Sequence, residues 1–172
     1  MKKIKMLMTI IVFIMSFFVH FIYDWFPSFF TSILFPVNES VWEHMKIIYT
    51  SILFSSFIEY LIYKYKNISV NNFILNIPVI SIVGIIIYLL LNFIVELFIP
   101  HNLVVSIILL LIVYVICEVF SYFILNCRKI KYEEIIGICL IILSYIIFGY
   151  LTYHPIEIEL FLDPITNTYG ID

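Results

Sequence analysis

The scarcest feature of this sequence is charge. Only 12% of its 172 residues are Asp, Glu, Lys or Arg, whereas 64% are hydrophobic and 19% are aromatic. A soluble domain of ordinary composition carries about 25% charged residues, most of them on its surface. The chain therefore lacks the polar surface that water requires, and lipid must cover most of it. This excludes soluble enzymes and soluble binding modules.

The chain also lacks alanine, clustered cysteines and a basic patch, and each absence argues against one kind of feature. The chain contains no alanine, so a small-residue cleavage site is hard to place after the apolar run 6–19, and we expect that run to remain as an anchor. Cys117, Cys127 and Cys139 have no metal-type spacing and lie in or beside apolar runs, which favours reduced apolar filler. There is no basic patch with interleaved aromatics, so we expect no nucleic-acid partner.

Long apolar runs are what the chain has in abundance. Several approach or exceed the roughly 20 residues that a helix needs to cross about 30 Å of hydrocarbon. A helix also satisfies its own backbone hydrogen bonds, which lipid cannot do. We therefore predict an all-α, polytopic transmembrane helix bundle, a single domain over residues 1–172 with the lipid bilayer as its partner. The predicted spanning helices are 4–24, 42–63, 73–96, 103–125 and 134–152.

Basic residues predict the orientation of this bundle. If the amino terminus is cytoplasmic, eight of the nine basic residues lie on the cytoplasmic side, as the positive-inside rule requires, and only Lys46 lies on the other side. We therefore expect a multi-pass membrane protein with a cytoplasmic amino terminus and an extracytoplasmic tail, 153–172. The eight residues are Lys2, Lys3, Lys5, Lys64, Lys66, Arg128, Lys129 and Lys131.

Most histidines and carboxylates fall at the opposite, outer boundary in this topology. The segment 25–37 is rich in aromatics and proline, which predicts an interfacial or re-entrant segment at headgroup depth. The alternating apolar residues in 156–162 suit a short strand or an extended lid over the outer face. The residues at this boundary are His20, His44, His101, His154, Asp24, Glu39, Glu43, Glu96, Glu157, Glu159, Asp163 and Asp172.

The stretch FPVNESVWEHMK, residues 35–46, concentrates polarity in this apolar chain. Asn38 is placed to cap the following helix, and Glu39 in its first turn would complement the helix dipole. Capping does not explain Glu43, His44 and Lys46, which fall inside the helix near the hydrocarbon boundary. Ionisable groups there need partners, and Glu43 can reach Lys46 three residues on.

Helical spacing and depth predict a shared outer site. His20 and His44 fall at similar depth, and mixed imidazole and carboxylate ligands suit zinc, manganese or iron. Glu43 is the candidate general base for a metal-bound water. The alternative is a structural network of ion pairs that fixes helix packing, and the absence of HExxH or HxxxH spacing favours it. His101 is a weaker ligand candidate. The candidate metal ligands are His20, Asp24, Glu39, His44, His154 and Asp163.

Two further carboxylates lie deeper in the membrane. Glu118 falls near the middle of the fourth predicted helix, where an ionisable residue is a candidate proton relay or ion site. It has no basic residue near it in its own helix, so we expect it to be protonated and hydrogen-bonded within the bundle. Glu59 lies about one turn from the basic end, where Lys64 and Lys66 can extend toward it.

The strings HFIYDW, FPVNESVWEHMK and FLDPITNTYGI resemble the signatures of a bacterial family of small multi-pass membrane proteins, a domain of unknown function. The resemblance covers the whole chain and implies a shared fold and a shared outer-face site, but no substrate. Its motif positions are His20, Asp24, Asn38, Glu39, Ser40, Trp42, Glu43, His44, Pro155, Asp163, Pro164, Thr168, Tyr169 and Gly170.

Three function classes remain open at this point. The first is a membrane-embedded, metal-dependent hydrolase of a lipid or peptide. The second is a small transporter or substrate-capture subunit, in which Glu118 and Glu59 continue a polar path inward. The third is a non-catalytic interaction or protection protein that presents its tail.

Overall fold

The computed structural model describes residues 1–98 and 103–171, so that His101 and Asp172 lie outside the described residues. Its helix bounds differ from the predicted spans by at most two residues. The elements are α1 (Lys2–Trp25), α2 (Phe29–Leu34), α3 (Val41–Tyr65), α4 (Phe73–Glu96), α5 (Leu103–Asn126), α6 (Glu133–Tyr153) and the short 3₁₀ helix η1 (Glu159–Phe161).

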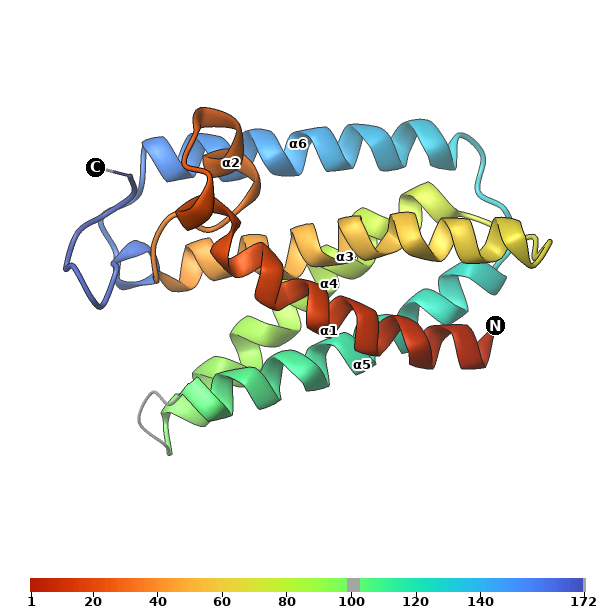
Figure 1. Ribbon diagram of the computed structural model, residues 1–172, viewed down its shortest axis with the longest axis horizontal. Helices are drawn as coiled ribbons and strands as arrows, with labels where there is room; N and C mark the ends of the chain where they lie inside the picture. Colours follow the sequence, from red (N-terminus) through yellow and green to blue (C-terminus); the bar gives the residue numbers. More distant parts are fainter. Residues whose placement is uncertain (99–102, 172) are drawn as a thin grey trace.

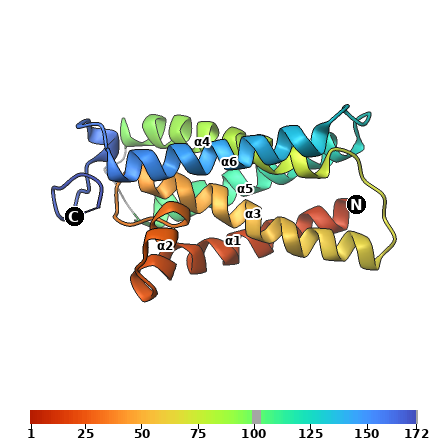
Figure 2. The same ribbon diagram turned by 90° about the horizontal axis from the view of Figure 1, so that it is seen from above.

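Five of these helices, α1, α3, α4, α5 and α6, are long and apolar enough to cross a membrane. This confirms the all-α bundle and suits a membrane location. The two chain termini lie at opposite ends of the bundle (Figures 1 and 2). We call the end that holds the start of α1 the amino-terminal end, and the end that holds the start of α3 the carboxyl-terminal end.

Helices α3 and α4 connect the others. Helix α3 packs against α1 and α4, while α4 also packs against α5 and α6. Of the five long helices α3 is the least hydrophobic and the most buried. Ser51, Ser55 and Ser56 are buried along it, because in lipid a polar side chain is best placed inside the bundle.

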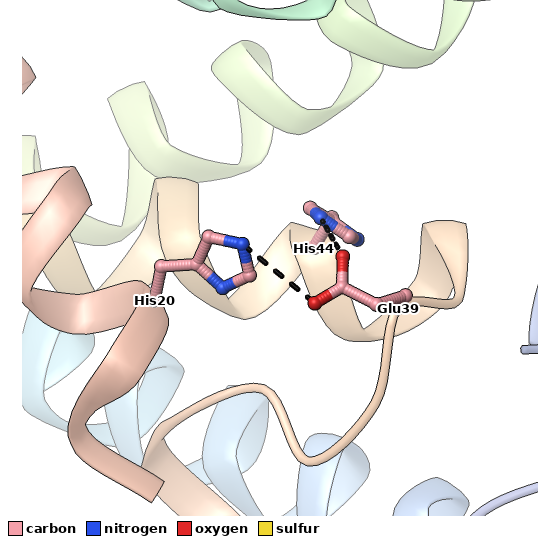
Figure 3. Close-up of side chains that lie close together, drawn as sticks. All are labelled: His20, Glu39 and His44. Carbon is pink, nitrogen blue, oxygen red and sulfur yellow. Dashed lines mark ion pairs between the residues drawn. The ribbon is translucent and has the colours of Figure 1, made fainter. Parts of the chain in front are cut away.

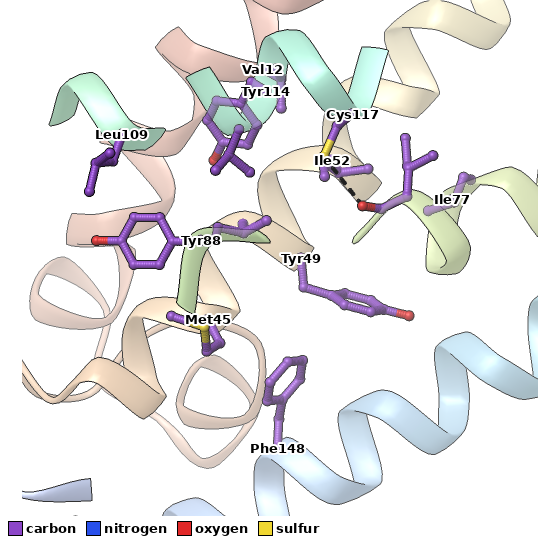
Figure 4. Packing of buried hydrophobic residues seen from close by; sticks show 13 residues of the cluster. Val12, Met45, Tyr49, Ile52, Ile77, Tyr88, Leu109, Tyr114, Cys117 and Phe148 are labelled. Carbon is purple, nitrogen blue, oxygen red and sulfur yellow. Dashed lines mark hydrogen bonds between the residues drawn. The ribbon is translucent and has the colours of Figure 1, made fainter. Parts of the chain in front are cut away.

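The hydrophobic core includes Met45, Tyr49 and Ile52 from the first half of α3 (Figure 4). Tyr49 of α3 packs edge-on against Phe148 of α6, with ring centroids 5.5 Å apart. Gly137 allows α6 to approach α4 closely, since a Cβ atom there would lie 2.7 Å from the backbone of Ile74. Cys117 is buried and reduced, and its thiol donates to the carbonyl of Ile80 at 3.4 Å.

The aromatic segment 25–37 contains the short helix α2, which packs against α6. Ser28 caps α2 through a reciprocal pair of hydrogen bonds with Thr31. Phe29 and Phe30 remain exposed, as expected for side chains at headgroup depth.

The tail does not form the strand or extended lid that its alternating residues suggested. It folds as η1 followed by a turn, closed by one antiparallel bridge between Leu162 and Tyr169. Phe161 is buried and stacks on Trp42 at the start of α3, with ring centroids 4.8 Å apart. The alternation failed as a guide because Ile156 and Ile158 remain exposed, whereas Phe161, which is outside the alternation, is the residue that packs on the helix.

Candidate metal centre

The polar stretch at residues 38–46 begins with a helix cap. Ser40 is the N-cap of α3, and its hydroxyl accepts a hydrogen bond from the Glu43 amide at 3.3 Å. Asn38, the predicted cap, instead accepts from the Ser40 amide at 2.9 Å and donates to the carbonyl of Gly170 at 2.8 Å. Glu39 therefore precedes α3 and is free to turn toward α1.

Three side chains meet near the carboxyl-terminal end: His20 of α1, Glu39 just before α3, and His44 of α3 (Figure 3). One ligand atom from each lies within 4.8 Å of the others. His20 Nε2 is 3.8 Å from Glu39 Oε1, and His44 Nε2 is 3.4 Å from Glu39 Oε2. The site is half-buried, so its groups remain within reach of solvent.

Hydrogen bonding prepares His44 as a ligand. Its Nδ1 lies 2.8 Å from the carbonyl oxygen of Ser40, which can only accept, so Nδ1 carries the proton. When the ring is neutral, Nε2, which lies toward Glu39, is left to coordinate an ion. This arrangement is typical of metal-bound histidines, whose second nitrogen donates to a carbonyl or carboxylate.

His20 is held less firmly. Its ring lies 5.4 Å from that of His44 and stacks on Phe21 at 4.7 Å, but its buried Nδ1 has no hydrogen-bond partner. A buried ring nitrogen without a partner costs free energy. His20 is therefore the ligand most free to reorient when an ion binds.

The donor set fits a tetrahedral metal ion. Ligand atoms about 2.0 Å from a tetrahedral ion are separated from one another by about 3.3 Å. His20 and His44 approach different oxygens of Glu39, and the three ligand atoms lie within 4.8 Å of one another, so they would have to close in by up to about 1.5 Å to bind one ion. Two histidines and one glutamate leave a fourth position open, as in zinc sites that bind water or substrate.

A pocket of about 380 Å³ adjoins this cluster, and its wall includes all three residues. Most of its surface is apolar, from side chains such as Leu103 and Ile165. Tyr88 and Asn92 add polar groups from α4. A ligand in this pocket would therefore bring an apolar portion beside the open metal position.

Glu43 and Lys46 form a separate, closed cluster on another face of the same turns of α3. Lys46 Nζ lies 2.7 Å from Glu43 Oε2, which also accepts from the Val37 amide at 3.0 Å. The hydroxyl of Thr152 accepts from Lys46 at 2.6 Å and donates to Glu43 Oε1 at 2.8 Å. The predicted pairing of Glu43 with Lys46 is present, and Glu43 does not line the pocket of the three-residue cluster.

The remaining predicted ligands lie elsewhere. Asp24 is exposed near the end of α1, and His154 lies beside Tyr150 on a different groove, between α2 and α6. Asp163 caps the tail turn, where its Oδ1 accepts from the Ile165 amide at 2.8 Å. The three-residue cluster found among the described residues includes none of them.

The deeper carboxylates have a partner that the sequence analysis did not assign. Glu59 and Glu118 both form ion pairs with Lys5 of α1, and neither Lys64 nor Lys66 takes this role. The sequence analysis counted Lys5 among the basic residues of the cytoplasmic side without expecting its burial, and in the structure only 5% of it is exposed. A signal was present: Lys5 falls on the helical face that also carries Ser16 and His20.

Comparison with known proteins identifies a family but no activity. One family model matches residues 1–171, and its description is a family of unknown function (DUF6512). No curated protein and no solved structure matches the chain. The resemblance inferred from the motifs is thus confirmed as membership of a whole-chain family of unknown function.

Proposed function

Since this chain belongs to DUF6512, a family of unknown function, we propose from its own geometry that it is a membrane metalloprotein. It binds one divalent ion, zinc or manganese, through His20, Glu39 and His44. The observation that carries the proposal is the convergence of these three ligand atoms within 4.8 Å on the wall of a pocket.

Hydrolysis is the reaction class that best fits this site. An ion with an open fourth position supplies a water molecule that is deprotonated near neutral pH. The largely apolar pocket would hold the hydrocarbon part of an amphiphile, with its ester or amide group beside the ion. The substrate class is therefore a lipid or another amphiphile; Glu43, paired with Lys46, is not the general base in this proposal.

The charge distribution supports a bacterial cell-membrane location with the amino-terminal end in the cytoplasm. Basic residues at helix ends and in connecting segments, such as Lys64, Lys66 and Lys129, gather at the amino-terminal end. The metal centre then lies at the extracytoplasmic face, within reach of substrates in the outer leaflet. Cysteines introduced singly at Ser28 and Asn67 test this, since an impermeant thiol reagent should label only the first in intact cells.

Metal analysis of purified protein tests the central proposal. After zinc loading and removal of free ion, the wild-type protein should retain one zinc per chain. The variants His44→Ala and His20→Ala should retain less than a tenth of this. His154→Ala is the matched control, because it removes a histidine outside the cluster, and it should retain the wild-type amount. Equal zinc in all four proteins would overturn the proposal.

Hydrolysis has its own test. Wild-type protein in lipid vesicles should release fatty acid or headgroup from a bacterial lipid extract. A chelator should stop the release and added zinc should restore it. If the protein bound one zinc per chain but released no product in a metal-dependent way, the proposed metal site would stand and the proposed hydrolysis would be wrong.

A further inference from the structure

A second polar cluster lies near the amino-terminal end, where α1 packs against both α3 and α5 (Figures 1 and 2). Lys5 of α1 forms ion pairs with Glu59 of α3 and with Glu118 of α5, the latter at 3.0 Å. Its ammonium group also donates to the hydroxyl of Ser121 at 2.5 Å. All three N–H bonds of the ammonium thus have acceptors near them.

The charges of this cluster do not balance. Two carboxylates share one ammonium, and the side chains of Lys5, Glu59 and Glu118 are only 6%, 3% and 7% exposed. Burial of an uncompensated charge costs several kcal/mol. One additional positive charge is therefore needed when all three groups are buried together.

Hydrogen bonding distinguishes the two carboxylates. Glu59 Oε1 accepts from the Tyr63 hydroxyl at 2.7 Å in addition to its ion pair with Lys5. Glu118 Oε2 is buried and has the Lys5 ammonium 3.0 Å away, but it has no second donor among the described residues, such as the hydroxyl that serves Glu59. Glu59 is therefore the better-stabilised anion, and Glu118 is the carboxylate that lacks a full set of donors.

Glu118 also borders an open space. A pocket of about 490 Å³ between α1 and α5 is lined by Lys5 and Glu118, and by apolar side chains such as Met6, Val119 and Phe123. These three apolar side chains are exposed, so in a membrane they face lipid. The carboxyl group of Glu118 is thus reachable from the bilayer.

We infer that Glu118 is a proton-binding site within the membrane: it holds the proton that balances the two carboxylates and one ammonium of this cluster. A proton suits the site better than a metal ion, because the ammonium of Lys5 already occupies the place between the carboxylates. The groups facing Glu118 from the packed elements are Lys5 of α1, Glu59 and Tyr63 of α3, and Cys117 of its own helix.

This inference does not depend on the metal centre. Lys5 and His20 are fifteen residues apart on α1, which corresponds to about 22 Å along the helix axis. The two clusters therefore lie toward opposite faces of the membrane. Each can be removed by substitution without touching the ligands of the other.

Labelling with dicyclohexylcarbodiimide tests the proton site, since this apolar reagent reacts with protonated carboxyl groups that are reached from lipid. Mass spectrometry of the protein in vesicles should find the label on Glu118, with labelling at pH 6 at least threefold above that at pH 8. Glu43 is the internal control: it is equally buried but paired one-to-one with Lys46, and it should stay unlabelled.

Infrared spectroscopy provides a second measurement that does not depend on reagent access. Wild-type protein at neutral pH should show a carboxylic-acid C=O band that is lost in Glu118→Gln, a variant that leaves Lys5 and Glu59 balanced. Absence of this difference would overturn the inference. Label on Glu59 in place of Glu118 would also overturn it, as would protection of Glu118 by sodium ions at constant pH.

Discussion

The polar groups at the start of α3 lie on two faces that differ in how completely they are hydrogen-bonded. On one face, Lys46 and Glu43 are 0% and 1% exposed and are fully hydrogen-bonded to each other and to neighbouring segments. On the other, His44 and the preceding Glu39 are half-buried, border a pocket and face His20 with spare acceptor capacity. The closed face stabilises the helix junction, and the open face is able to bind an ion.

This comparison shows that the role of a polar side chain near a membrane boundary depends on whether its hydrogen-bonding groups all have partners. Lys46 donates to the carbonyls of Ser32 and Phe35 as well as to Thr152, so it ties the segment before α3 to α6. Its removal should damage the fold, whereas removal of His44 should damage ion binding.

The largest effect should come from Lys46→Met. This change leaves the Glu43 carboxylate buried without its cation, which should lower the free energy of unfolding by about 3–5 kcal/mol. Unfolding in mixed micelles by titration with a denaturing detergent measures this. Glu43→Gln combined with Lys46→Met should recover at least half of the loss, because no uncompensated charge remains. If Lys46→Met alone were as stable as the wild type, the pair of Glu43 and Lys46 would not stabilise the fold.

A smaller effect is expected from Gly170→Ala. Gly170 has a φ of +70°, and a Cβ atom there would lie 2.6 Å from the carbonyl oxygen of Thr152. Left-handed strain costs about 1–3 kcal/mol for a residue other than glycine, so the tail should detach from Asn38. Limited proteolysis should then cleave within 156–171 at least several-fold faster. Ile156→Ala, at an exposed tail position, should leave the cleavage rate unchanged.

The smallest effect on stability should follow His44→Ala. Without metal it removes one hydrogen bond to the Ser40 carbonyl, worth about 0.5–1.5 kcal/mol. Ion binding should change far more: zinc at 100 times its dissociation constant stabilises a binding protein by about 2.7 kcal/mol. Thermal unfolding should thus show a zinc-dependent rise in Tm for the wild type and none for His44→Ala. A large loss of stability without metal, comparable to that of Lys46→Met, would erase the distinction between the two faces.

Local sequence patterns predicted the helices and part of the site, but they could not predict contacts between residues far apart in the chain. Apolar runs fix the spans because helix length must match membrane thickness. The prediction that His20 and His44 lie at similar depth agrees with their rings, whose centroids are 5.4 Å apart. Thr152 and Gly170 contact the start of α3 from more than 100 residues away, and their partners are chosen by tertiary packing. The burial of Lys5 could not be predicted from its position near the start of the chain, because it depends on Glu59 and Glu118 from two other helices.

The most direct test of the account is X-ray absorption at the zinc edge of the loaded protein, in the wild type and in two variants. We expect two imidazoles and one carboxylate around zinc in the wild type. In His20→Ala the zinc signal should fall below a tenth of the wild-type signal, and in the double variant Glu43→Gln, Lys46→Met the spectrum should be unchanged. Zinc without imidazole ligands in the wild type, or a spectrum altered only in the double variant, would contradict the assignment of binding to the open face.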